Sequence, residues 1–298
     1  MRILRIATPI AAFAAAALLL TGCVNNSVAA PESSGPATVV AKDDAAAKLV
    51  PAKIVKAGVL EIGTDATYAP NEFKDSSGKA IGWEIELADA MAAKLGLKTN
   101  YHLATFDHII PSITGGKYDV GLSSFFDTVD RQKVVDFADY YSAGVQWASP
   151  AGTTVDPTNA CGLKLAVQNG TTQALEDTPA KSKECTDAGK PAITALGYDS
   201  QDDATAAVAL GRADATSADS PVTQYAVKQS KGKLVLAGPV YNSFFYGMPV
   251  AKGNGTLVKA LEAALVSLKK DGTYTTILTK WGVEKGALSD IGINLAKS

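Results

Sequence analysis

The stretch VLEIGTDATYAP at residues 59–70 contains the pattern that decides the fold. It begins with a short apolar segment, 59–63, that reads as a strand, and the turn-rich segment 64–70 follows at once. A helix is predicted at 84–95, where apolar residues recur at helical spacing until Gly96. This order is typical of α/β proteins with helix-covered parallel sheets. Ligands of such open sheets bind beyond the carboxyl ends of the strands.

The alternation of strands and helices continues along the chain. Further strands are predicted at 119–124, 164–168 and 213–217, and further helices at 106–113, 205–210, 257–268 and 274–281. This folded part, about 240 residues, is long enough for two lobes.

The start of the chain has the composition of an export signal. Arg2 and Arg5 precede an apolar run at 10–20, which is too short to cross a bilayer because a span takes about 20 apolar residues. The run ends in Leu20-Thr21-Gly22-Cys23, which resembles a bacterial lipobox. We expect residues 1–22 to be a lipoprotein signal peptide and Cys23 to anchor the protein to the outer face of the bacterial cytoplasmic membrane. An ordinary secretory signal with an unrelated cysteine is the alternative.

Residues 23–51, rich in Ala, Ser, Pro and Val, are expected to be a flexible tether.

Two cysteines remain after Cys23. In an exported protein Cys161 and Cys185 are expected to form a disulfide, and closing a loop of about 24 residues would contribute about 3 kcal/mol. Two buried free thiols are the alternative. The cysteines and the only histidines, His102 and His108, show no metal-ligand spacing, so neither a metal nor a cofactor is expected.

The charge of the chain excludes one class of partner. Its formal net charge is −2, and without Arg2 and Arg5 there are 26 basic against 30 acidic residues, a net charge of −4. Nucleic acid is not expected as a partner, because its recognition needs a basic surface. No catalytic triad, Cys-His pair or nucleotide-binding glycine motif stands out, so an enzyme is not expected.

A series of short motifs runs from residue 53 to residue 285. They are GTDATYAP at 63–70, GKAIGWEIEL at 78–87, FD at 106–107 with IP at 110–111, GKYDV at 116–120, DR at 130–131 ahead of DF at 136–137, GTT at 170–172, GRADA at 211–215 with Asp219, and DGTY at 271–274. In this order and spacing they resemble the family 3 periplasmic amino-acid-binding proteins of ABC importers. Each motif alone is weak evidence for this family, whereas the whole series is highly specific to it.

The resemblance implies an α/β, type II periplasmic-binding-protein fold, in which two lobes joined by a two-strand hinge close over the ligand. The chain would cross between lobes near 144–149 and 243–248. Lobe 1 would combine residues 52–146 and 247–288, and lobe 2 would comprise 147–246. The implied function is capture of an amino acid by a monomer, which delivers it to ABC permease subunits served by a cytoplasmic ATPase.

An amino acid carries a carboxylate and an ammonium, and a closed site must satisfy both charges. The resemblance assigns the carboxylate to the guanidinium fork of Arg131 and to Thr171 and Thr172, which lie between a strand and a helix. It assigns the ammonium to Asp219. Two strand-end residues would complete the shell around these charges, Ser123 and Ser124.

The other matched positions concern the ligand's side chain. Tyr68 and Phe106 occupy the places where the family packs aromatic rings against the ligand's aliphatic stem. Asp65 matches a position that accepts hydrogen bonds from the ligand side chain, and Gln168 faces the same end of the pocket. These residues favour glutamine, asparagine or a basic amino acid. Phe126 replaces a small hydroxyl residue and is expected to fill pocket volume or to reshape the carboxylate shell.

A second departure from the family is Asn71-Glu72, where the family commonly has a phenylalanine and its neighbour. Some proteins of this fold are cyclohexadienyl dehydratases, which need a general acid over the ligand. Glu72 is the only candidate for that acid. A dehydratase acting on a prephenate-like acid is therefore the alternative function.

Overall fold

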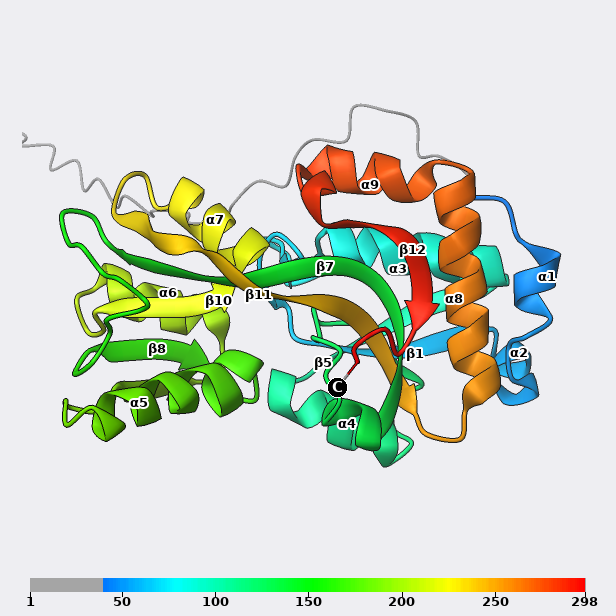
Figure 1. Cartoon of the computed structure of the whole chain (residues 1–298). Helices are drawn as coiled ribbons and strands as arrows, with labels where there is room; N and C mark the ends of the chain where they lie inside the picture. The colour runs from blue at the N-terminus through cyan, green and yellow to red at the C-terminus, as the bar shows by residue number, and fades with distance from the viewer. Residues whose placement is uncertain (1–39, 298) are drawn as a thin grey trace, which may run out of the picture.

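The structure is a computed structural model that describes residues 40–297, in which helices and strands alternate as predicted (Figure 1). The helices are α1 (Asp44–Ala47), α2 (Ala52–Ala57), α3 (Trp83–Leu95), α4 (Phe106–Thr114), α5 (Thr178–Asp187), α6 (Gln201–Ala209), α7 (Ser220–Gln229), α8 (Gly255–Lys270) and α9 (Thr273–Trp281). The strands are β1 (Val59–Thr64), β2 (Thr67–Tyr68), β3 (Glu72–Lys74), β4 (Ala80–Ile81), β5 (Lys98–Leu103), β6 (Val120–Gly121), β7 (Val135–Pro150), β8 (Lys164–Gln168), β9 (Thr194–Tyr198), β10 (Ala215–Asp219), β11 (Leu234–Ala251) and β12 (Ala287–Ile293). Single turns complete the described part: η1 (Arg131–Lys133), η2 (Gln173–Asp177) and η3 (Glu284–Gly286).

One nine-stranded sheet runs through the molecule in the order β5-β1-β6-β11-β7-β10-β8-β9, with β12 also paired to β7. Strand β1 is parallel to β5 and β6, and β8 is parallel to β9 and β10, as strand–helix alternation predicts. The long strands β7 and β11, of 16 and 18 residues, run antiparallel to each other and join the two halves of the sheet (Figure 1). The predicted parallel pairing is thus found within each half, and the two connecting strands make the sheet as a whole mixed.

Both segments predicted for the lobe crossings, 144–149 and 243–248, lie within β7 and β11. The pairing register between these strands shifts three times, between Ala237 and Tyr241, between Tyr241 and Phe244, and between Tyr246 and Gly247. Such irregularities interrupt the ladder and bend a strand pair locally. The connection between the two halves of the sheet is thus also its least regular part.

The folded part of the chain extends beyond the predicted limits at both ends. Asp43 caps α1 by accepting hydrogen bonds from two backbone N–H groups, and Ala46 and Val50 are buried in the main core. Residues 44–51 are therefore not part of a flexible tether; one apolar pair four residues apart is too weak a signal to reveal so short a helix. At the other end β12 pairs with β7 past residue 288. The predicted signal peptide, Cys23 and the start of the tether lie outside the described residues.

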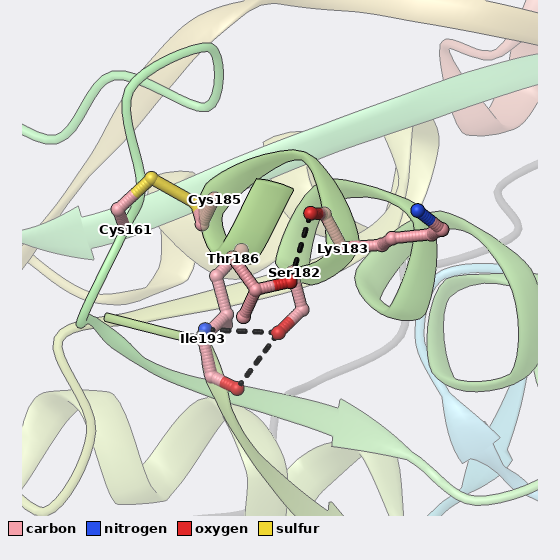
Figure 2. Close-up of a disulfide and its surroundings, with 6 residues drawn as sticks. All are labelled: Cys161, Ser182, Lys183, Cys185, Thr186 and Ile193. Carbon is pink, nitrogen blue, oxygen red and sulfur yellow. Dashed lines mark hydrogen bonds between the residues drawn. A yellow bond between two sulfur atoms is a disulfide. The ribbon is translucent and has the colours of Figure 1, made fainter. Parts of the chain in front are cut away.

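The predicted disulfide is confirmed. Cys161 and Cys185 are bonded, with their Cα atoms 5.5 Å apart (Figure 2). The bond ties the loop before β8 to α5, within the predicted lobe 2. On the same helix Ser182 Oγ accepts from the backbone N–H of Ile193, 3.0 Å away (Figure 2). Over residues 40–297, no helix combines the length and the apolar character that crossing a bilayer requires.

Candidate functional site

A small cavity lies where the polar turns after β1, β6 and β8 meet the end of β10. The placement follows from the topology, because side chains just beyond the carboxyl ends of strands share one edge of a sheet. The cavity is lined by all eleven residues expected to bind ligand and by one further residue, Gln173: Asp65, Tyr68, Phe106, Ser123, Ser124, Phe126, Arg131, Gln168, Thr171, Thr172, Gln173 and Asp219.

Arg131 supplies a cation to the cavity and connects the two predicted lobes. Its Nη1 donates to the carbonyl of Phe126 at 2.9 Å, and its Nη2 donates to the carbonyl of Gly170 at 3.1 Å. The guanidinium carbon lies 5.5 Å from the ring centres of Phe106 and Phe125, within cation–π range. Burial lowers the pKa of Arg131 to about 10. The side chain therefore stays charged at neutral pH.

The contact between Arg131 and Gly170 depends on a close approach of the backbone at Gly170 to Asp107. Gly170 has a φ of +78°, and a Cβ atom there would lie 2.7 Å from the Cβ of Asp107. Only glycine combines this left-handed backbone with so little space. Among residues 40–297, no acceptor pairs with the backbone N–H groups of the next two residues, Thr171 and Thr172. These N–H groups and Arg131 give this side of the cavity anion-binding character.

Asp219 supplies the opposite charge. Its carboxylate oxygens accept hydrogen bonds from Gln173 Nε2 at 2.6 Å and from Tyr246 Oη at 2.7 Å. Its backbone N–H donates to Tyr68 Oη at 3.0 Å. Burial raises the pKa of Asp219 to about 7, against the opposing effect of these hydrogen bonds and of Arg131. A cation placed beside this carboxyl would favour its ionised form.

A second carboxylate, that of Asp65, lies at the end of β1. It accepts hydrogen bonds from Thr67 Oγ1 at 2.7 Å, from the backbone N–H of Phe106 at 3.0 Å and from Gln168 Nε2 at 2.8 Å. Burial raises the pKa of Asp65. Because Gln168 lies in the predicted lobe 2 and Asp65 in the predicted lobe 1, this contact is a further link between the two predicted lobes. Each of these three partners is neutral, so Asp65 can still pair with a cation.

The two serines of the cavity wall are held from behind by buried carboxyl groups. Ser123 Oγ accepts from the backbone N–H of Asp65 and donates to Glu72 Oε1, both at 3.0 Å. Ser124 Oγ donates to Glu84 Oε1 at 2.8 Å. Burial raises the pKa of both glutamates, and the nearby carboxyl of Glu84 raises the pKa of Glu72 further, whereas a hydrogen bond with Glu72 acts to lower the pKa of Glu84. Glu72, the candidate general acid, thus lies behind Ser123 and does not line the cavity.

The two departures from the family pattern have structural explanations. Asn71 Nδ2 donates to Ser124 Oγ, and its Oδ1 accepts from Trp83 Nε1, both at 2.7 Å, so this residue is a buried polar bridge. Phe126 packs its ring 4.7 Å from the Phe244 ring and 5.4 Å from the Tyr246 ring, measured between centroids. Phe126 therefore lines the cavity and packs against Tyr246, the residue that donates to the Asp219 carboxylate.

Sequence reasoning missed Gln173 and Glu84. Gln173 directly follows Thr172, so its place beside the predicted turn was the available signal. Glu84 lies in the GWEIEL motif, but nothing local indicates that a helix residue is buried behind a serine forty positions later. Within residues 40–297, no group of three or more His, Cys, Asp or Glu side chains is arranged to hold a metal ion.

Comparison with known proteins gives the site its context. Residues 60–284 match the model of the bacterial extracellular solute-binding proteins, family 3. The arginine-binding protein ArgT of Corynebacterium glutamicum is 40% identical over 250 residues, which cover 83% of this chain and 81% of that protein.

Two solved structures of amino-acid-binding proteins are similar to this chain in sequence and in fold. An ancestral arginine-binding protein bound to arginine is 36% identical, with a TM-score of 0.69 over 75% of this chain and 98% of its own. An ancestral amino-acid-binding protein, a precursor of cyclohexadienyl dehydratase, is 33% identical, with a TM-score of 0.66 over 77% of this chain and 97% of its own. The predicted type II fold is confirmed. The chain belongs to the bacterial extracellular solute-binding proteins, family 3.

Proposed function

We propose that this protein captures a free L-amino acid with a cationic side chain, with arginine preferred, and delivers it to ABC permease subunits driven by a cytoplasmic ATPase. The proposal rests on one observation: Arg131 of lobe 1 and Asp219 of lobe 2 line the same small cavity. The main chain of an amino acid carries the two complementary charges. Its carboxylate would pair with Arg131 and its ammonium with Asp219, so the ligand would hold the lobes together.

The side-chain preference follows from Asp65. Its carboxylate has neutral partners only and can pair with a guanidinium or ammonium at the far end of the ligand. Tyr68 and Phe106 offer ring surfaces to an aliphatic stem. From the sequence, glutamine, asparagine and basic amino acids all remain open. Similarity to an arginine-binding protein of Corynebacterium glutamicum favours the basic class.

Export and anchoring belong to the same proposal. The apolar run at 10–20 and the lipobox-like motif ending at Cys23 support a lipid anchor on the outer face of the cytoplasmic membrane. Such an anchor would keep the binding protein, as a monomer, close to the permease.

A dehydratase is the second candidate, because a precursor of cyclohexadienyl dehydratase shares the fold. A dehydratase needs a general acid in contact with its substrate. Glu72 is separated from the cavity by Ser123, which favours binding without turnover. Incubation of the purified protein with prephenate tests this alternative, since product formation would establish an enzyme.

Calorimetric titration against the twenty amino acids tests the proposed function. We expect L-arginine to bind most tightly. Arg131→Ala should weaken binding by about 30-fold to several thousand-fold, the range for breaking a buried charge pair. Arg212→Ala removes an exposed arginine and is the matched control. Absence of binding to any amino acid, or equal affinities of the two variants, would overturn the proposal.

A further inference from the structure

The segment after β12, residues 294–297, packs against two buried carboxyl groups. The backbone N–H of Leu295 donates to Asp139 Oδ2 at 2.8 Å, and that of Ala296 donates to Asp127 Oδ2 at 2.9 Å. Both aspartates have no exposed surface. Buried carboxyl groups need hydrogen-bond donors, and here consecutive backbone N–H groups of one segment provide them.

One of these aspartates belongs to the loop that carries cavity residues. Asp127 directly follows Phe126, and Gln132 directly follows Arg131. Gln132 Nε2 donates to both oxygens of Asp127, at 2.8 and 3.0 Å, and to the carbonyl of Ala296 at 3.1 Å. Segment 294–297 therefore bonds to the residues next to Phe126 and next to Arg131.

The same loop is closed on its other side by Arg131 itself, because Nη1 donates to the carbonyl of Phe126. Two hydrogen bonds and the peptide bond between Phe126 and Asp127 thus connect Ala296 to the guanidinium. A binding site needs its charged groups held within about 0.5 Å of their working positions. The second oxygen of Asp139, Oδ1, has no hydrogen-bond partner within the described residues. The hydrogen bond from the backbone N–H of Leu295 to Oδ2 is therefore important for this buried carboxyl group.

We infer that residues 294–297 are a positioning element of the ligand site, which holds the loop 126–132 so that Arg131 and Phe126 face the cavity. None of these four residues lines the cavity, and all lie beyond the part of the chain that matches the family model. The effect on affinity rests on the proposed function, whereas the effect on the loop does not.

A pair of substitutions at one position tests the inference. Ala296→Pro removes the N–H that Asp127 accepts, whereas Ala296→Gly keeps it and should behave like the wild type. We expect Ala296→Pro to weaken binding of L-arginine about tenfold or more, as for a lost hydrogen bond to a charged group. In the absence of amino acid, it should also speed hydrogen exchange of the backbone amides at 126–132.

The two readouts separate the possible failures. If the wild type binds no L-arginine, the proposed function is wrong, and the exchange rates still decide the role of the segment. If Ala296→Pro and Ala296→Gly bind and exchange alike, the segment is not a positioning element. If circular dichroism shows that Ala296→Pro does not fold, Gln132→Ala is measured in its place. Affinity and hydrogen-exchange rates equal to those of the wild type in Gln132→Ala would also overturn the inference.

Discussion

The charge of Asp219 should make amino-acid binding depend on pH. Asp219 is 3% exposed, and burial raises the pKa of its carboxyl group to about 7. A ligand ammonium held against it would favour the carboxylate, so binding lowers this pKa and releases a proton. Affinity should therefore be highest above the pKa of the ligand-free site and should fall as the pH drops through it. Tyr68 and Tyr246, with pKa values raised well above 10, stay neutral over this range, and Arg131, at about 10, stays positively charged.

The size of the effect follows from that pKa. Between about pH 8 and about pH 6 the ionised fraction of such a group falls from roughly nine-tenths to roughly one-tenth. Affinity should then fall about tenfold, which is about 1.4 kcal/mol. Asp219→Asn removes the charge at nearly constant size. At the higher pH it should cost about 2–5 kcal/mol of binding free energy, as for a broken buried charge pair, and it should abolish most of the pH dependence.

Calorimetry with L-arginine at both pH values, in two buffers of different ionisation enthalpy, measures the affinity and the number of protons released. Asp214→Asn is the matched control, because it makes the same substitution at an exposed position five residues earlier. If the wild type bound equally well at both pH values without releasing protons, or if Asp219→Asn kept native affinity, the ammonium would not lie against Asp219.

Three further changes test other parts of the account. Asp65→Asn should weaken binding of arginine more than binding of glutamine, because only arginine brings a side-chain charge; equal losses in parallel titrations would contradict this. Unreduced, denatured protein should show no free thiols at Cys161 and Cys185, and reduction should lower the melting temperature, since closing this loop contributes about 3 kcal/mol; two alkylatable thiols would argue against the bridge. Cys23→Ala should leave the precursor without lipid in a radiolabelling experiment, and label persisting in the variant would show that the anchor lies elsewhere.

The positions of the cavity residues could be predicted from the sequence because they follow a local rule. Asp65, Ser123 and Thr171 each come just after a strand, and Asp219 ends one. Such strand ends meet at one edge of a parallel sheet, so their polar side chains converge wherever the strands pair. Motif order then suggested a role for each residue, and the structure brings all eleven together. The roles themselves remain predictions that the titrations above decide.

Tertiary structure alone decided what depends on partners far apart in the chain. Periodicity could not show that β7 and β11 join both halves into one mixed sheet, because strand pairing is set by contacts across more than eighty residues. Nor could it place Glu84 behind Ser124, or Ala296 against Asp127 across a separation of 169 residues. Apolar spacing reports which face of an element is buried, whereas the partner of a buried carboxyl depends on which distant backbone the fold brings within 3 Å of it.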